Sequence, residues 1–415
     1  MPHSYRFLLP LLALSSIAMA AEPIIVPCDQ PVKSKKRGVC VNKADAKDFM
    51  ALSPGVSWYY TWHFTDTNNA PAAAKMTFLP MVWGNQPAMI EGLANYLKSN
   101  KPPYVLALNE PNLKGQAFID PKTTADSYQK IKAIADRHRI PVVGPHMALG
   151  SSDGDSIKAM DPIDKKQVTY TFMNPFLKAF FHYMGKTDVP AVAAHSYGEY
   201  GELKWMVEMM HKEFQRPVWV TEFASWKARD AAAELDYMIQ SVDLMERLPY
   251  VQGYAWFKDR LADHSKMSLL APEKGVLTPL GQAYVKMPVH DPEVFYRLPG
   301  RLQLESYTTM QDAEMTRASD PEGFLEMRVL DTKSWLNYQV FTESPKTFIA
   351  NLRFAVSEGT VVALMSGQTV LAKFKGTTTG WQTVTAPVKL PAGKSSFRLV
   401  SDHAAKLDWL EFFDK

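Results

Sequence analysis

The amino-acid sequence predicts an α/β fold, a (β/α)8 TIM-type barrel, followed by a second, all-β sandwich domain. Three observations support this prediction. Short apolar runs alternate with amphipathic helical stretches from about Gly55 to Met287. The apolar runs are continuous, which is typical of parallel strands covered on both faces. Beyond about Asp291 the helical patterns give way to short strand-like stretches separated by Gly, Ser and Thr. The 415 residues also exceed one ordinary domain.

The predicted barrel strands follow one another with helices between them. This repetition favours a barrel over an open doubly wound sheet, because the glycine-rich phosphate turn that many open sheets carry is missing. We predict seven strands, one fewer than a complete barrel requires, so we expect one further strand whose sequence pattern is short or weak. The predicted strands are 56–60, 76–82, 104–108, 142–144, 189–194, 218–221 and 252–257, and the predicted helices are 88–98, 124–138, 200–214 and 231–247.

The first residues have the pattern of a secretory signal. Arg6 precedes the apolar run 7–14, and small residues at 18–20 precede Ala21. A basic start, a short apolar core and such a cleavage site predict a signal peptide over 1–21 and export to the periplasm or the extracellular space. The apolar run is too short to span a bilayer, and no later segment looks like a membrane helix, so no membrane partner is expected.

The two cysteines of the chain, Cys28 and Cys40, both follow this predicted signal. In an exported protein this placement predicts a disulfide that closes the mature N-terminus. A metal site is not expected there, because two thiolates without further ligands do not complete a tetrahedron.

Composition excludes one class of partner. The formal net charge is +3, with acidic and basic residues interspersed, so no concentrated basic face for a nucleic acid is expected. The short basic run 33–37 is expected at a solvated surface. Aromatic residues make up 12% of the chain, including ten Trp. Such residues suit flat apolar ligands such as sugars, with core packing as the alternative.

Two glutamates follow predicted barrel strands closely. Glu110 lies in the segment Leu-Asn-Glu-Pro-Asn at 108–112, and Glu222 lies in Thr-Glu-Phe at 221–223. The carboxyl ends of barrel strands converge on one face, where active sites sit. Hydrolysis of a glycosidic bond needs a proton donor and a second carboxylate that faces the anomeric carbon. A structural ion pair would explain either glutamate alone, but the two together predict a glycosidase.

Other residues at strand ends fit supporting roles. Asn109 is placed to hold a sugar 2-hydroxyl, and His195 and Tyr197 point to the same side of an extended segment, where one of them would orient the nucleophile. His146 fits a structural role equally well. No metal-ligand spacing accompanies His195, so no metal is expected in the catalytic site. The aromatic candidates for sugar stacking, each with core packing as the alternative, are Trp58, Tyr60, Trp62, Trp83, Trp226 and Trp256.

A wider set of motifs resembles glycoside hydrolase family 128, the clan A β-1,3-glucanases built on a (β/α)8 barrel. The resemblance covers about 50–285 and implies Glu110 as acid/base, Glu222 as nucleophile and retention of configuration. The motifs are Gly-Val-Ser-Trp-Tyr-Tyr-Thr-Trp at 55–62, Phe-Leu-Pro-Met-Val-Trp at 78–83, the segment 108–112, His-Ser-Tyr at 195–197, the segment 219–223 and Tyr-Ala-Trp-Phe at 254–257.

The last part of the chain resembles carbohydrate-binding module family 6 over about 297–413. The motifs are Leu-Glu-Ser-Tyr at 304–307, the segments 334–340 and 407–412, Gly-Trp-Gln-Thr at 380–383 and Leu-Pro-Ala-Gly at 390–393. This resemblance implies a jelly-roll sandwich, often with a structural calcium, that binds β-glucan or xylan. It makes Trp381 the best stacking candidate and places Phe324 where the family usually has Tyr, with Glu305 in the first motif. The predicted limits are 22–290 for the barrel and 297–415 for the module, and the predicted sandwich strands are 301–305, 335–341, 347–354, 361–365, 369–374, 382–385, 396–400 and 406–412.

Together these patterns predict a secreted, retaining endo-β-1,3-glucanase. It would cleave laminarin- or curdlan-type β-glucan through a glycosyl-enzyme intermediate, need no cofactor for catalysis and act as a monomer. Two alternatives stay open: a glycosidase of the same mechanism acting on another β-linked polysaccharide, and a non-catalytic glycan-binding protein.

Overall fold

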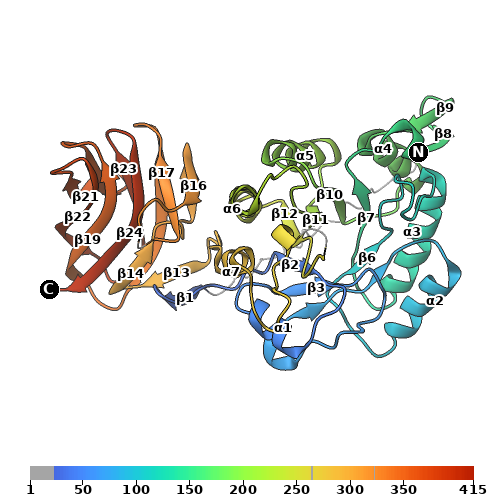
Figure 1. Cartoon of the computed structure of the whole chain (residues 1–415), viewed down its shortest axis with the longest axis horizontal. Coiled ribbons are helices and arrows are strands. Elements are labelled where there is room, and N and C mark those ends of the chain that lie inside the picture. Colours follow the sequence, from blue (N-terminus) through green and yellow to red (C-terminus); the bar gives the residue numbers. More distant parts are fainter. Residues whose placement is uncertain (1–22, 263–264, 322) are drawn as a thin grey trace, which may run out of the picture.

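The computed structural model describes residues 23–262, 265–321 and 323–415. A mixed α/β part and an all-β part lie at opposite ends of the chain's long axis (Figure 1). The predicted signal peptide 1–21 lies outside the described residues. Within the described ranges, no helix has the length and apolar character needed to cross a membrane.

A sheet of parallel strands organises the α/β part. Its order is β4-β3-β2-β12-β11-β10-β7-β6-β5. The strands at the two edges, β4 and β5, are consecutive parts of one segment. This segment bonds to both neighbours, since Leu79 N donates to Tyr59 O and Leu106 N donates to Pro80 O, each at 2.9 Å. The sheet therefore curls into a barrel-like form. Its strands are β2 (Arg37–Cys40), β3 (Trp58–Tyr60), β4 (Thr77–Phe78), β5 (Met81–Val82), β6 (Val105–Ala107), β7 (Val142–Ala148), β10 (Ala191–Ser196), β11 (Val218–Phe223) and β12 (Val251–Trp256).

Helices cover the outside of this sheet (Figure 1). Several begin at a side-chain cap, as where Asp120 accepts hydrogen bonds from the N–H groups of Lys122 and Thr123. The four helices predicted from sequence are confirmed as α2, α3, α5 and α6, whereas α1, α4 and α7 were not predicted. The helices are α1 (Ala46–Leu52), α2 (Pro87–Tyr96), α3 (Pro121–Asp136), α4 (Met173–Met184), α5 (Tyr200–Phe214), α6 (Ala231–Arg247) and α7 (Pro279–Lys286), with short 3-10 turns η1 (Ala72–Ala74), η2 (Asp153–Asp155) and η3 (Ser265–Met267) and a hairpin of β8 (Ile157–Met160) and β9 (Gln167–Tyr170).

Large side chains fill the interior enclosed by the parallel strands. Two indoles fit there because glycines face them. A Cβ added at Gly38 would lie 2.3 Å from the Trp58 ring, and one added at Gly253 would lie 2.3 Å from the Trp219 ring. The buried cluster is Cys40, Trp58, Tyr60, Leu79, Met81, Leu106, Val143, Ala191, Ala193, Trp219 and Ala255.

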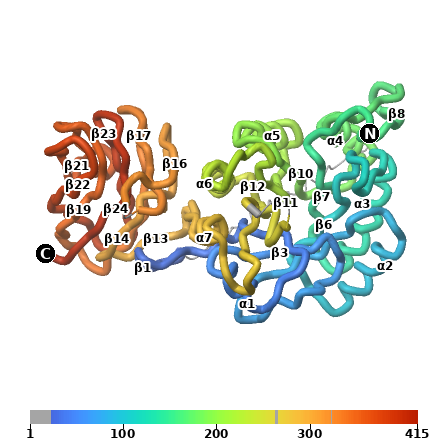
Figure 2. The backbone as a smooth tube through the Cα atoms, viewed as in Figure 1, coloured from blue at the N-terminus to red at the C-terminus, as the bar shows by residue number. Residues whose placement is uncertain are grey.

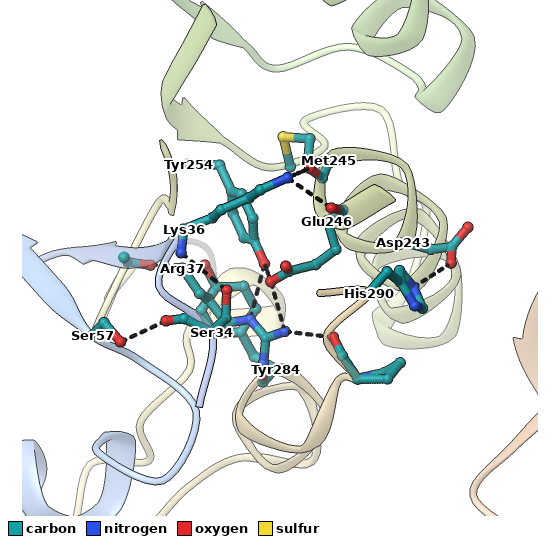
Figure 3. Close-up of polar contacts among 12 residues, drawn as sticks. Ser34, Lys36, Arg37, Ser57, Asp243, Met245, Glu246, Tyr254, Tyr284 and His290 are labelled. Atoms are coloured by element: carbon teal, nitrogen blue, oxygen red, sulfur yellow. Dashed lines mark hydrogen bonds and ion pairs between the residues drawn. The ribbon is translucent and has the colours of Figure 1, made fainter. Parts of the chain in front are cut away.

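The strand that the sequence prediction lacked is β2. Its first residue ends the basic run 33–37, which was expected at a solvated surface. This expectation is wrong for Arg37, which is fully buried. Its guanidinium lies 3.1 Å from Oε1 of Glu246 and donates to the Tyr254 hydroxyl and to the carbonyls of Tyr284 and Pro288 (Figure 3). A buried charge is tolerated where it is paired and fully hydrogen-bonded, and Arg37 meets both conditions.

The all-β part consists of two sheets that pack face to face. Buried and partly buried residues alternate along β18 and β19, as expected for strands with one face in the core. Phe397 of one sheet lies 6.0 Å from Phe412 of the other, measured between ring centroids. The predicted sandwich strands are confirmed, while the jelly-roll connectivity stays a prediction. One sheet has the order β1-β13-β18-β23-β20-β21 with β15 on β18, and the other has the order β16-β17-β24-β19-β22 with β14 on β24. The strands are β1 (Ile24–Pro27), β13 (Val294–Arg297), β14 (Gly300–Gln303), β15 (Thr309–Gln311), β16 (Ala313–Arg317), β17 (Leu325–Val329), β18 (Trp335–Thr342), β19 (Lys346–Val356), β20 (Val361–Ser366), β21 (Thr369–Lys375), β22 (Gly380–Leu390), β23 (Gly393–Ser401) and β24 (Ala405–Asp414).

The beginning of the described chain belongs to the sandwich. Strand β1, which lies within the range assigned to the barrel, pairs in parallel with β13, so the blue and orange segments run side by side (Figure 2). Polar contacts also join the two parts. Asp243 of α6 lies 3.1 Å from Nε2 of His290 and accepts a hydrogen bond from the hydroxyl of Tyr307.

The predicted disulfide between Cys28 and Cys40 is wrong, because both thiols are free and buried. Cys28 directly follows β1, and its Sγ lies 3.2 Å from the carbonyl oxygen of Arg297 in the sandwich. Cys40 ends β2, and its Sγ lies 3.3 Å from the carbonyl oxygen of Thr221 inside the barrel. The two side chains therefore belong to different cores. Burial raises the pKa of Cys28 to about 12 and the pKa of Cys40 well above its usual range.

Candidate active site

A cavity of about 590 Å³ opens among the carboxyl ends of the parallel strands. Glu110, just after β6, and Glu222, near the end of β11, both line it, as expected if the barrel delivers them to one face. The lining residues are Asn42, Trp62, Trp83, Asn109, Glu110, Leu113, Gln116, Ala148, Leu149, Gly150, His195, Tyr197, Glu222, Trp226, Phe257 and Lys258.

Glu110 is held in place by its backbone. Its φ of 44° is in the left-handed region, which non-glycine residues rarely adopt. Its N–H donates to the carbonyl oxygen of His146 at 2.7 Å. The residue is 6% exposed, and Oε1 lies 2.9 Å from Nδ1 of His195. The strained turn after β6 thus directs a nearly buried carboxyl group toward β10.

Glu222 is surrounded by hydrogen-bond donors. Oε1 accepts from the hydroxyl of Tyr60 at 3.1 Å and from Nε1 of Trp62 at 2.7 Å, and Oε2 accepts from the hydroxyl of Tyr197. Burial raises the pKa of both tyrosines well above their usual range, and the charge of Glu222 adds to this shift. The tyrosines therefore stay protonated and can donate to Glu222.

His195 lies between the two glutamates. Its Nδ1 is 2.9 Å from Oε1 of Glu110 and 3.5 Å from Oε2 of Glu222. Burial alone would lower the pKa of His195, but the charges of Glu222 and Glu110 outweigh burial and raise this pKa above its usual value. An imidazolium here offsets the repulsion between two buried carboxylates.

Several other predicted residues also lie on the cavity wall. Asn109 donates from Nδ2 to Oε1 of Gln116 at 3.0 Å, and its Oδ1 is buried without a hydrogen-bond partner in the protein. That oxygen is therefore available to a ligand hydroxyl. Trp62, Trp83 and Trp226 supply apolar faces, and the Trp226 side chain is 44% exposed.

Three of the predicted sugar contacts are not on the cavity wall. Trp58 is deep in the barrel, where its Nε1 donates to the carbonyl oxygen of Lys36. Tyr60 is fully buried, and its hydroxyl donates to Oε1 of Glu222. Trp256 faces the helices instead of the barrel interior, and its Nε1 donates to the carbonyl oxygen of Met267. Trp58 and Tyr60 point inward as expected but too deep, and Trp256 points to the opposite side of its strand.

Four further residues of the wall were not among the predicted sugar contacts, namely Asn42, Gln116, Phe257 and Lys258. The signal for Phe257 was present, since strand alternation turns the residue after Trp256 inward. Lys258 is 4% exposed, and its Nζ lies 5.6 Å from the ring centroid of Trp62. Burial lowers its pKa below the usual value. Asn42 follows the unpredicted strand β2, and Gln116 comes from the loop after Glu110, so neither had a sequence signal.

The three candidate residues of the sandwich do not share one cavity. Trp381 is half-buried on β22, with the guanidinium carbon of Arg353 5.5 Å from its ring centroid. Phe324 is 40% exposed, and Nζ of Lys286 lies 6.0 Å from its ring centroid. Glu305 lines a different hollow, near Cys28 and Tyr296. Burial raises the pKa of Glu305 to about 8.

A barrel-like sheet with two buried glutamates in one cavity at its carboxyl edge defines the class of a glycoside hydrolase. The family model described as glycosyl hydrolase catalytic core matches residues 38–284, which is more than half of the chain. The chain belongs to this family.

Two of the many solved structures that match the fold are endo-β-1,3-glucanases. One is a GH128 (subgroup II) endo-β-1,3-glucanase from Pseudomonas viridiflava, with 30% identity over 62% of this chain and 100% of that chain and a TM-score of 0.53. The other is a GH128 (subgroup II) endo-β-1,3-glucanase from Sorangium cellulosum, with 26% identity, the same coverage and a TM-score of 0.52. A comparison with curated protein sequences gives no match.

Proposed function

We propose that this chain is a retaining endo-β-1,3-glucanase whose catalytic unit is a (β/α)8 barrel. In this count the segment that carries β4 and β5 is one strand of the eight. The observation that carries the proposal is the shared contact of Glu110 and Glu222 with Nδ1 of His195, inside one cavity.

The geometry supports double displacement. Oε1 of Glu110 and Oε2 of Glu222 can be no farther apart than the sum of their distances to Nδ1 of His195, 2.9 Å and 3.5 Å. The two oxygens that face each other are therefore close enough for the separation of about 5–5.5 Å that is typical of retaining pairs.

Each glutamate has a role that its surroundings favour. Glu222, held as a carboxylate by three donors, would attack the anomeric carbon while Glu110 gives its proton to the departing glycosidic oxygen. In the second step Glu110 would take a proton from water as that water displaces Glu222. The donors to Glu222 are Tyr60, Trp62 and Tyr197.

The substrate class is proposed from the neighbours and the cavity wall. Both matched structures are named endo-β-1,3-glucanases. Trp62, Trp83 and Trp226 give the cavity the flat apolar faces against which glucose rings stack. Export by the predicted signal peptide would bring the enzyme to polysaccharide outside the cytoplasm.

The sandwich is proposed to bind β-glucan, with Trp381 as its stacking residue.

A structural calcium in the sandwich also stays a proposal. Oε2 of Glu305 and Oδ2 of Asp408 are buried without a hydrogen-bond partner in the protein, and such oxygens are the donors that calcium takes. No group of three or more Asp, Glu, His or Cys side chains placed to hold a metal occurs in the part of the chain that the structure describes. Such an ion would therefore need backbone or water ligands besides these two.

The test is hydrolysis of a polysaccharide panel by the purified protein. We expect reducing ends and a ladder of oligosaccharides from laminarin and curdlan, none from cellulose or mannan, and NMR detection of a first-formed β-anomer. The control is the double variant Glu110→Gln/Glu222→Gln, which keeps the shape of both side chains. Cleavage of another polysaccharide alone would change the substrate, and an α-anomer as first product would exclude retention.

A further inference from the structure

A chain of hydrogen bonds extends from the two glutamates through the barrel wall. Nε2 of His195 lies 3.2 Å from Oγ1 of Thr221, and Nδ1 of His146 lies 2.7 Å from the same oxygen. Nε2 of His146 lies 3.2 Å from the carbonyl oxygen of Val143. His146, His195 and Thr221 are on the adjacent strands β7, β10 and β11, and each is at most 2% exposed.

Counting protons along this chain leaves one consistent arrangement. The carbonyl of Val143 only accepts, so Nε2 of His146 carries a hydrogen. Burial, with the neighbouring His195 adding to it, lowers the pKa of His146 well below its usual value, which keeps this histidine neutral. Nδ1 of His146 is then bare and accepts the one hydroxyl hydrogen of Thr221. The oxygen of Thr221 is left to accept, so Nε2 of His195 keeps its hydrogen.

We propose that Thr221 and His146 fix the tautomer of His195, so that Nδ1 is its proton-exchanging atom and Glu110 and His195 hold one catalytic proton between them. Thr221 and His146 are positioning residues in this scheme, because they act through His195. The inference deepens the proposed hydrolase function, because it concerns the proton that Glu110 gives to the leaving group.

The arrangement satisfies both states of the pair. When His195 is an imidazolium, Nδ1–H donates to the carboxylate of Glu110. When His195 is neutral, bare Nδ1 accepts a hydrogen bond from the carboxylic acid of Glu110. In either state Nε2–H stays bonded to Thr221, so no buried donor loses its partner.

The proton balance follows the two steps of double displacement. The proton passes from Nδ1 to Glu110 and on to the glycosidic oxygen, which keeps the electron pair of the broken bond while Glu222 bonds to the anomeric carbon. When water attacks, its proton returns to Glu110 and then to Nδ1. The titratable groups that face His195 are Glu110 from the end of β6, Glu222 from β11, His146 from β7 and Tyr197 after β10. Glu110 and His195 therefore share their proton in the field of Glu222.

Replacing the bridging hydroxyl tests the chain. In Thr221→Val, which keeps the shape of the side chain, Nε2–H of His195 loses its acceptor and the imidazolium becomes less stable. We expect the alkaline limb of the kcat/KM profile to move down by about one pH unit, because a lost hydrogen bond to a charged group has about that effect. Thr221→Ser keeps the hydroxyl and should leave the limb in place. An unmoved limb in a folded Thr221→Val enzyme would overturn the proposal.

A second measurement observes the tautomer of His195 directly. In the wild-type protein, ¹⁵N NMR of the imidazoles should show His195 protonated at Nε2 and bare at Nδ1 above the alkaline limb, with the signal assigned by its loss in His195→Gln. Protonation at Nδ1 alone would overturn the proposal. If no glycan is cleaved but this tautomer is observed, the proposed hydrolase function fails while the hydrogen-bond assignment stands.

Discussion

Nε1 of Trp62 lies 2.7 Å from Oε1 of Glu222. The φ of Trp62 is 58°, so an unusual backbone conformation turns this indole toward the carboxylate. The same ring lines the cavity. Trp62 therefore donates to the carboxyl group of Glu222 and also presents its ring to the cavity, where we propose that a sugar ring stacks.

Replacing Trp62 with Phe should separate these functions. The variant keeps an aromatic face but removes the donor to Glu222. Because a hydrogen bond to a charged group contributes about 1.5–3 kcal/mol, we expect kcat/KM to fall roughly 10- to 100-fold. The loss should appear mainly in kcat, measured by initial rates on laminarin. Tyr197→Phe removes a donor to the other oxygen and serves as the comparison. A change in KM alone would mean that Trp62 contributes only to substrate binding.

Glu110→Gln should lower kcat by about 10²- to 10⁴-fold on laminarin, because it removes the proton donor. On an activated aryl glycoside, which needs no protonation to leave, azide should restore turnover by attacking the glycosyl-enzyme and giving a β-glycosyl azide. Glu222→Ala should be inactive and should not yield that product. A β-glycosyl azide from Glu222→Ala would reverse the two roles.

The exposed indole of Trp226 should contribute to binding. Trp226 lines the cavity and is 44% exposed. We expect Trp226→Ala to raise KM for laminari-oligosaccharides roughly 2- to 10-fold, with little effect on kcat. Trp205 of α5 is a matched control, since it is 47% exposed and does not line the cavity. Equal effects of the two variants would remove Trp226 from the binding site.

The buried ion pair of Arg37 and Glu246 should matter for stability. Arg37→Met leaves Glu246 buried without its cation, so the free energy of unfolding should fall by about 3–5 kcal/mol in urea titrations. The double variant Arg37→Met/Glu246→Leu should recover part of this loss. Arg317 and Asp236 form an exposed pair for comparison, and Arg317→Met should cost less than about 1 kcal/mol. An equally small loss at Arg37 would contradict the expectation.

Asp243 should make stability fall in acid. Burial raises its pKa, but hydrogen bonds from His290 and Tyr307 and the charge of Arg247 outweigh burial, so the folded-state pKa lies below the usual value. Its contribution is therefore full above the unfolded pKa of about 3.9 and is lost as pH falls through the folded pKa. Asp243→Asn should lose stability at pH 7 but little at pH 2. Parallel losses at both pH values would exclude this linkage.

Strand β2 and the free state of the two cysteines were not predicted, because both depend on contacts between distant parts of the chain. Strand β2 begins with Arg37, and a basic residue at this position predicts an exposed segment. In the folded chain, Glu246, Tyr254 and the carbonyl of Pro288 surround Arg37 and allow its burial. Cys28 and Cys40 are close in sequence in a chain with a predicted signal peptide, a pattern typical of a disulfide. The chain between them passes from the sandwich into the barrel, so the two thiols are in separate cores.

Local sequence patterns predicted most of the barrel strands, four of the helices, most of the sandwich strands and the positions of Glu110 and Glu222 at strand ends, because periodicity and strand polarity are local properties. The depth of each side chain and its partners depend on the tertiary structure. Trp58, Tyr60 and Trp62 alternate onto the same side of one segment, yet the first packs in the core, the second supports Glu222 and the third reaches the cavity. Height along the barrel axis depends on how neighbouring strands are staggered, and no single strand encodes that stagger.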